Sequence, residues 1–90
     1  MSAGLHFIST IGEVSDTNFV ETRNRIANDN PGSLPDFIDK RALFAEIARN
    51  KGFIDMVVIL SDNKNTRHAE TVADAVKKMG AGEVRVIHCL

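Results

Sequence analysis

The residues best suited to chemistry follow a short apolar run in the second half of the chain. Residues 56–60 (MVVIL) are continuously apolar, and a carboxylate, three amide or hydroxyl side chains and several cations come directly after them. In an open parallel sheet, ligands collect outside the carboxyl ends of the strands, so this stretch is the first place to look for a site. The candidate ligand-binding residues are Asp62, Asn63, Lys64, Arg67 and His68.

Asp62 has two interpretations. A carboxylate at the end of a buried strand could hold Mg²⁺, which prefers one or two carboxylates together with water. Alternatively, Asp62 and Asn63 accept hydrogen bonds from nearby backbone N–H groups, and Asn65 or Thr66 caps the next helix. Turns favour these residue types for structural reasons alone, so the turn interpretation is preferred. Replacing Asp62 by Asn is then expected to change the stability little.

Residues 55–90 are similar to the strand, acid, helix and strand unit of Toprim domains, the Mg²⁺-binding modules of primases and topoisomerases. In that family a buried strand ends in Asp-x-Asp; Asp62 matches the first acid, and Lys64 stands at the second. Residues 12–16 (GEVSD) loosely resemble the Glu-Gly-x-x-Asp that is expected after the first strand. The resemblance implies a metal site made of Asp62, Glu13 and Asp16.

Residues 61–63 (SDN) also resemble the end of a late strand in the von Willebrand A-type domains of RNA-binding TROVE proteins, where a Ser/Thr-Asp-Asn run is common. The Asp-x-Ser-x-Ser metal motif of those domains is absent from this sequence. Apart from the loose match at residues 12–16, each resemblance covers only about residues 55–90.

Histidine and cysteine give no metal or nucleophilic motif. His6, His68 and His88 share no short metal spacing, and Cys89 is the single cysteine. A Zn²⁺ site would need His6, His88 and Cys89 on neighbouring strands. Because consecutive residues of a strand point to opposite faces, His88 and Cys89 are expected neither to share a metal nor to form a catalytic pair. A lone cysteine forms no internal disulfide, which fits a reducing compartment.

The charges are uneven but nearly balanced. Residues 1–36 carry five acids and two arginines, or −3, while residues 37–90 carry seven acids and nine bases, or +2. Lys64, Arg67, His68 and Arg85 could contact phosphate. The chain has no Trp or Tyr, however, and its five Phe fall at expected core positions, so no aromatic platform for single-stranded nucleic acid is expected. Nucleic-acid binding is therefore not favoured over an ordinary solvated surface.

Hydrophobic periodicity predicts the elements that position these residues. Alternation predicts strands near 5–11 and 84–89, and the continuous apolar run predicts a buried central strand near 56–61. Helices are expected from the N-cap candidates at 15–17 to about 28, from a cap at Asp36 to about Asn50, and from Thr66 to about Met79. Residues 31–35 are expected to form a loop, and Gly52 to adopt the left-handed conformation after the second helix.

The expected fold is a single small α/β domain over residues 1–90, with the order β-α-α-β-α-β. About three mainly parallel strands would form the sheet, with helices packed on it. The last strand contains no proline that would protect its edge, so a homodimer at micromolar concentration is predicted.

Length and composition limit the function classes. The chain has 90 residues, a net charge of −1 and no apolar run that would span a bilayer or form a signal peptide, so a cytoplasmic protein without membrane contact is expected. No acid–base pair, activated nucleophile or cofactor motif is present. The sequence therefore favours a non-catalytic protein-interaction or regulatory module without a cofactor, acting on itself or on another protein. The alternative is a divergent Mg²⁺-dependent nucleotide or nucleic-acid-binding domain that uses Asp62 with Glu13 and Asp16.

Overall fold

The computed structural model describes residues 4–29 and 34–89. Along the chain the elements are β1 (Leu5–Ile11), α1 (Asp16–Asp29), β2 (Asp36–Phe37), α2 (Lys40–Arg49), β3 (Ile54–Ser61), α3 (Thr66–Lys78) and β4 (Glu83–His88). The strands form one sheet in the order β2-β1-β3-β4, and every pair of neighbours is parallel. Parallel neighbours need a crossover between them, and the three helices supply these connections.

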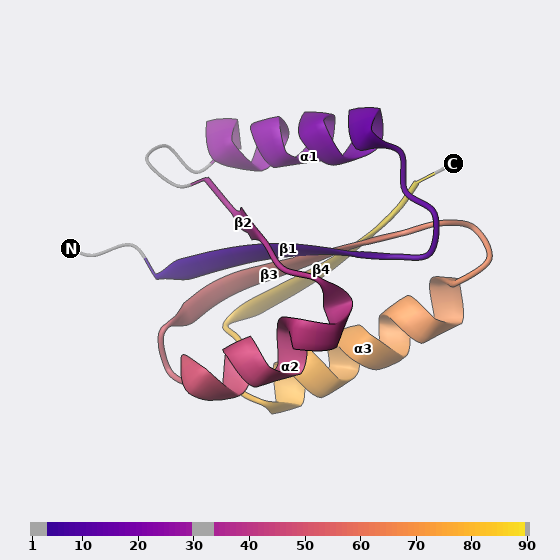
Figure 1. Cartoon of the computed structure of the whole chain (residues 1–90). Helices are drawn as coiled ribbons and strands as arrows, with labels where there is room; N and C mark the ends of the chain where they lie inside the picture. The colour runs from indigo at the N-terminus through magenta and orange to yellow at the C-terminus, as the bar shows by residue number, and fades with distance from the viewer. Residues whose placement is uncertain (1–3, 30–33, 90) are drawn as a thin grey trace.

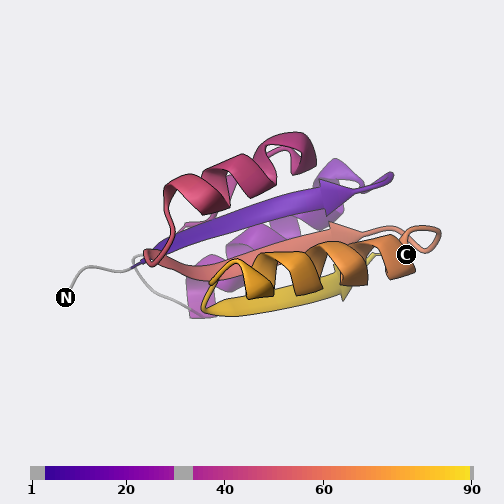
Figure 2. The same ribbon diagram turned by 90° about the horizontal axis from the view of Figure 1, so that it is seen from below.

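The helices lie on both faces of the sheet. α1 covers one face, and α2 and α3 lie side by side on the other (Figure 1). The view from below shows α2 and α3 in front of the strands and α1 behind them (Figure 2). The α/β class and the parallel β3-α3-β4 unit are therefore as predicted.

The sheet has a fourth strand that the periodicity did not predict. β2 consists of Asp36 and Phe37 alone, paired with Phe7 and Ile8 of β1. The expected order of two consecutive helices between the first two strands was wrong, because β2 separates α1 from α2. Asp36 consequently belongs to a strand and does not cap α2; Asp39 is the N-cap and accepts a 2.8 Å hydrogen bond from the N–H of Arg41. Of the predicted loop at 31–35, residues 31–33 lie outside the described residues.

β3 is the centre of the core, as its continuous apolar run predicts. Val57, Val58, Ile59 and Leu60 are each 0% exposed. Side chains alternate between two clusters, so that Val57 and Ile59 pack beneath α2 and α3, while Val58 and Leu60 pack beneath α1. A strand that is covered on both faces has no polar side to offer water, which is why its sequence does not alternate.

α1 covers its face less completely than α2 and α3 cover theirs. Ile26 is its one buried residue, and Phe19 packs only partly against the same cluster. The Phe19 ring also meets Phe37 of β2 edge-on, with 5.5 Å between centroids, and the Arg23 guanidinium lies 5.6 Å from the Phe19 centroid. Phe37 therefore packs against α1, although 52% of its surface is exposed.

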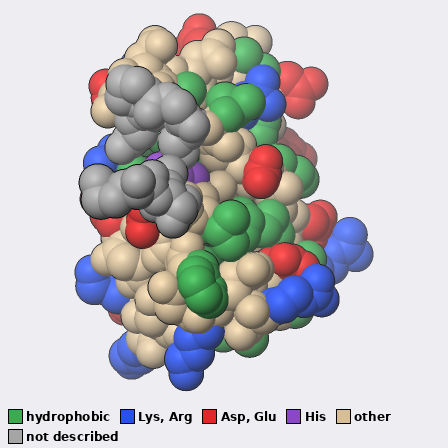
Figure 3. All heavy atoms as spheres, turned by 90° about the vertical axis from the view of Figure 1, so that its left-hand side faces the viewer, with side chains coloured by type: hydrophobic (Ala, Val, Ile, Leu, Met, Phe, Trp, Pro, Cys, Tyr) green, Lys and Arg blue, Asp and Glu red, His purple; other side chains and the backbone are tan. Residues whose placement is uncertain are grey.

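Some large apolar side chains are exposed on separate elements. They are Val20, Leu34, Phe37, Phe44 and Phe53, so the expectation that all five Phe are core residues was wrong for three of them. Phe53, at 72% exposed, directly precedes β3 at the amino end of the strand. The side of the molecule on the left of Figure 1, where β1 begins, shows apolar side chains between acidic and basic ones (Figure 3). No helix among the described residues is long and apolar enough to cross a membrane.

Ser9 carries a polar group in the core without a partner. Its side chain is 1% exposed on β1, and its Oγ atom has no hydrogen bond to the described residues. An unpaired buried hydroxyl costs about 1–3 kcal/mol. We expect Ser9→Ala to raise the free energy of unfolding by about 1 kcal/mol, or the melting temperature by roughly 4–8 °C.

Ser61→Ala is the matched control for this experiment. Ser61 is also buried, but its Oγ donates a 2.9 Å hydrogen bond to the backbone oxygen of Asp62. Ser61→Ala removes this hydrogen bond and should therefore lower the melting temperature of the protein. Thermal unfolding of both variants tests the prediction, and a lower melting temperature for Ser9→Ala would contradict it.

Candidate functional site

The carboxyl ends of β1 and β3 meet at the point where the strand order reverses. After β1 the chain crosses by α1 to β2 on one side, and after β3 it crosses by α3 to β4 on the other. The two strands are neighbours to their last residues, where Ile11 pairs with Ser61. In open α/β sheets, the loops that diverge from such a point leave a crevice between them, and ligands bind there.

Asp62 joins the two loops at this point. Its Oδ2 atom accepts a 2.8 Å hydrogen bond from the backbone N–H of Glu13. Its Oδ1 atom accepts hydrogen bonds from the N–H groups of Lys64 (3.0 Å) and Asn65 (2.9 Å) and from Nδ2 of Asn65 (2.7 Å). Three of these donors converge on Oδ1 and fill it, whereas Oδ2 accepts one hydrogen bond from the described residues and keeps a lone pair for a further donor or ligand.

The contact between the loops requires a glycine at position 12. Gly12 has φ of +78°, a conformation that L side chains rarely adopt, and a Cβ atom there would collide with Oδ2 of Asp62. Glycine thus permits the turn that brings the N–H of Glu13 to the carboxylate.

The hydrogen bonds also favour the ionised form of Asp62. The N–H of Glu13, followed by the amide of Asn65, holds the pKa of Asp62 below its ordinary value of 3.8. Asn65 is the N-cap of α3 but makes no capping hydrogen bond with its side chain, because that side chain is turned to Asp62. Asp62 therefore fixes the start of α3 as well as the end of β1.

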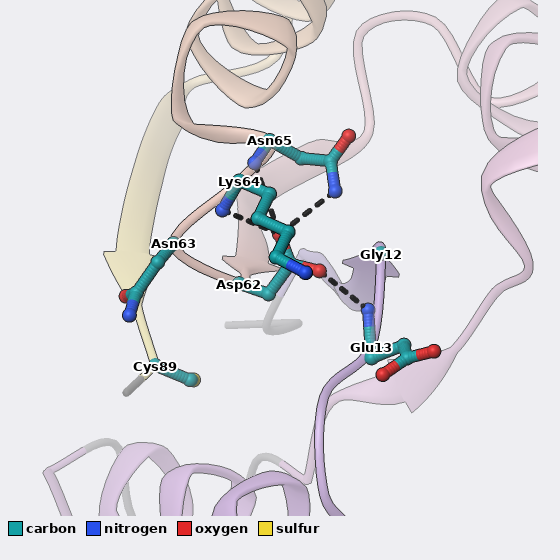
Figure 4. Close-up of a pocket in the computed structure, with 7 residues that line it drawn as sticks. All are labelled: Gly12, Glu13, Asp62, Asn63, Lys64, Asn65 and Cys89. Atoms are coloured by element: carbon teal, nitrogen blue, oxygen red, sulfur yellow. Dashed lines mark hydrogen bonds between the residues drawn. The ribbon is translucent and has the colours of Figure 1, made fainter.

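A shallow pocket of about 370 Å³ lies beside these hydrogen bonds (Figure 4). Its lining residues are Gly12, Glu13, Asp62, Asn63, Lys64, Asn65 and Cys89. Glu13 presents its backbone N–H, and not its carboxylate, to Asp62 (Figure 4). Burial raises the pKa of the Cys89 thiol above its ordinary value of 9.0, which keeps the thiol protonated and a weak nucleophile at neutral pH.

The structure brings together part of the predicted ligand-binding set. Asp62, Asn63 and Lys64 line the pocket, whereas Arg67 and His68 lie in the first turn of α3 and are exposed away from its lining. Gly12, Asn65 and Cys89 line the pocket and were not predicted as site residues. Their contribution depends on which strands are neighbours, although a glycine directly after the first strand is a signal that could have identified Gly12.

The residues of the metal interpretation are only partly brought together. Glu13 is adjacent to Asp62 through its backbone, while Asp16 lies in the first turn of α1 and does not line the pocket. Within residues 4–29 and 34–89, no three His, Cys, Asp or Glu side chains are grouped so that they could hold a metal ion. A cation at Asp62 would have to bind through Oδ2, because three N–H groups already meet Oδ1.

A second hollow, of about 450 Å³, lies on the other side of Gly12. It is lined by Thr10, Gly12, Asp39, Lys40 and Arg41, at the start of α2. Basic residues in the first turn are poorly placed for the helix dipole, but the Asp39 carboxylate offsets them. Asp39 accepts from the backbone N–H of Arg41, which is the main reason its pKa is lowered, and forms an ion pair with the Arg41 side chain at 3.3 Å.

Comparison with protein families, with curated proteins and with solved structures finds no match to this chain. The fold and the pocket thus define the class, a small parallel α/β domain whose loops meet at the reversal of its strand order.

Proposed function

We propose that the protein is a non-catalytic interaction module that associates with a second copy of itself through the free edge of β4. The observation that carries the proposal is the place of β4 at the end of the strand order, where β3 is its one paired neighbour among the described residues. Its six residues, Glu83–His88, include no proline. An edge of this kind offers unpaired N–H and C=O groups to another strand.

Two hydrogen bonds show which residues of β4 direct their backbone to the free edge. The N–H of Cys89, directly after β4, donates to the oxygen of Ser61 in β3 at 2.7 Å. The N–H of Asp62, directly after β3, donates to the oxygen of Ile11 in β1 at 3.3 Å, so Ser61 and Asp62 direct their backbones to opposite sides of β3. Because the backbone groups of successive strand residues alternate between the two sides, residues in phase with Cys89 bond to β3. The N–H and C=O groups of Val84, Val86 and His88 therefore point outward.

The opposite edge of the sheet offers much less. β2 has two residues, and its Phe37 side chain is engaged by Phe19 of α1. The exposed apolar side chains of the other elements stand on separate elements, and single exposed side chains need no functional explanation. A 90-residue chain also buries a smaller fraction of its surface on folding than a larger domain does, so association would add stability.

The alternative is a divergent Mg²⁺-dependent nucleotide or nucleic-acid-binding domain that uses Asp62 with Glu13 and Asp16. The closeness of Asp62 to the Glu13 loop favours it, and the three N–H donors that converge on Oδ1 count against it. A titration with Mg²⁺, described in the Discussion, separates the two functions.

The first test is the mass of the protein in solution. We expect light scattering at micromolar concentration to give about twice the 9.9 kDa mass of the chain. His88→Pro removes one outward N–H from each copy without removing a bond to β3. Two lost hydrogen bonds of about 1 kcal/mol each should raise the dissociation constant roughly ten- to thirtyfold.

His68→Ala provides the control, because His68 is an exposed histidine on α3, away from the free edge. This variant should keep the mass and dissociation constant of the unaltered protein. A monomeric mass for the unaltered protein over the micromolar range would overturn self-association. A His88→Pro dimer of unchanged affinity would remove the edge of β4 from the interface.

A further inference from the structure

We infer that the two copies join β4 to β4 in antiparallel order about a two-fold axis through Val86, so that two four-stranded sheets become one continuous sheet. This inference rests on the proposed function, because it specifies how the self-association takes place. A two-fold axis would also limit assembly to two copies, since each molecule then uses the one long edge that its described strands leave free.

Symmetry restricts where the axis can lie. A two-fold axis perpendicular to the sheet keeps the α1 face of both copies on one side of the joined sheet. Two residues that stand directly opposite each other must then have their side chains on the same face. Side chains alternate along β4, with Val84 and Val86 packed on the side of α2 and α3 and Ile87 on the side of α1. The axis must therefore pass through a residue. An axis through Ile87 would set Val84 opposite position 90, beyond the end of β4, so the candidates are Val84, Arg85 and Val86.

An axis through Arg85 is unfavourable because of charge. It would set each guanidinium directly opposite Arg85 of the partner subunit, and like charges in a cross-strand pair destabilise it. Within one chain Arg85 forms an ion pair with Glu83, and these side chains are 45% and 49% exposed. The net charge of this ion pair is zero in each copy. A register that keeps the two Arg85 side chains apart therefore brings no repulsion to the edge.

An axis through Val84 would require Gly82 as a pairing residue. Val86 would then stand opposite Gly82 of the partner subunit. Gly82, however, is turned toward β3: its N–H donates to the oxygen of Ile54 at 3.0 Å. It also lies so close to β3 that an added Cβ atom would be 2.9 Å from the oxygen of Asp55. Its N–H is therefore not available to a second copy.

An axis through Val86 uses all the outward groups of the strand. Val86 faces Val86 of the partner subunit, and Val84 faces the partner's His88, so every position with an outward backbone is paired. On the other face, the Arg85 stem lies opposite the partner's Ile87, and the guanidinium keeps its own Glu83. This register also brings the partner's Glu83 opposite Cys89, at the rim of the pocket.

Cysteine cross-linking identifies the residue of β4 through which the two-fold axis passes. Each variant carries Cys89→Ser, and this background must first retain the dimeric mass. A residue on a two-fold axis faces itself, so Val86→Cys should yield a disulfide-linked dimer with copper phenanthroline, on a non-reducing gel, while Val84→Cys should yield little. The expected Cα spacing in such a pair, about 5.5 Å, suits a disulfide.

A second pair of variants protects the test against poor folding of Val86→Cys. Arg85→Cys and Ile87→Cys stand opposite each other in this register, so each alone should stay unlinked and their mixture should cross-link. Linking of Val84→Cys alone, or of Arg85→Cys alone, would move the axis and overturn the inference. A dimeric mass with no cross-link in any variant would also overturn it, yet leave the proposed function standing, whereas a monomeric mass would overturn the proposed function.

Discussion

Replacing Val58 by Asp is expected to unfold the domain at room temperature. Val58 is 0% exposed, between Ile8 of β1 and the β4 strand on the α1 side of the sheet. A buried carboxyl without a partner, added to the lost apolar contacts, should cost more than about 4 kcal/mol. Domains have about 5–15 kcal/mol of stability, and a chain of this size lies toward the lower end, so little or none of its stability would remain. Circular dichroism and thermal unfolding measure the effect.

Ile59→Asp extends this experiment to the other layer. Ile59 is equally buried, but it packs in the cluster beneath α2 and α3. Since β3 is covered on both faces, both variants should unfold. Val20→Asp is the control, because Val20 is 42% exposed on α1, and its melting temperature should change little. A Val58→Asp or Ile59→Asp protein that melted like the unaltered one would show that β3 is not the central strand.

The elements that could be predicted are those with a strong local signal. β3 has a continuous apolar run, and α3 has apolar residues at helical spacing, of which Ala69, Val72 and Val76 are buried. Gly52 was expected to be left-handed after the second helix, and its φ of +89° confirms this. In these segments the hydrophobic period and the end signals agree with the tertiary packing.

β2 could not be predicted, because two residues are too few to show a period of two. Asp36 and Phe37 become a strand only because β1 offers them an open edge, and Phe37 is then held by Phe19. The N-cap of α2 was predicted wrongly for a similar reason. Asp36 and Asp39 are both acceptable N-caps in sequence, and the pairing of Asp36 with β1 leaves that position to Asp39.

Local sequence patterns predicted the candidate site on its β3 side, and Glu13 on the β1 side was named only through the resemblance to Toprim domains. Asp62 follows a buried strand, and this alone marked it. That its carboxylate would meet the N–H of Glu13 depends on β1 being the neighbour of β3, a contact across 49 positions of the chain. Cys89 enters the pocket for the same reason, through the pairing of β4 with β3. Arg67 and His68 were included because they are near Asp62 in sequence, but the first turn of α3 points them elsewhere.

The four hydrogen bonds to Asp62 alter what its substitution is expected to do. The sequence suggested that Asn would be nearly neutral at this position. An Asn side chain, however, has one acceptor oxygen, and its NH₂ group would face N–H donors that now meet Asp62. We expect Asp62→Asn to lower the melting temperature clearly at pH 7, and Asp74→Asn, an exposed acid of α3, to change it little.

The pH dependence follows from the direction of the pKa. The pKa of Asp62 is lower in the folded protein than its ordinary value of 3.8, chiefly because of the Glu13 N–H, so its contribution to stability is complete above about 3.8. The contribution is lost as the pH falls below that value toward the folded pKa. The difference in melting temperature between the unaltered protein and Asp62→Asn should therefore shrink on acidification from pH 5 to about pH 2. Asp39 contributes with the same sign, and its share remains in the variant.

Addition of Mg²⁺ to the same two proteins decides between the proposed function and its alternative. If Asp62 only holds the loops together, millimolar Mg²⁺ should leave both melting temperatures unchanged. If it were a metal ligand beside Glu13 or Asp16, the clustered acids would repel each other without the ion, and Asp62→Asn would be more stable than the unaltered protein in the absence of metal. Mg²⁺ would then raise the melting temperature of the unaltered protein alone. The two functions thus predict opposite signs for Asp62→Asn without metal, and a higher melting temperature for that variant would favour the Mg²⁺-dependent domain.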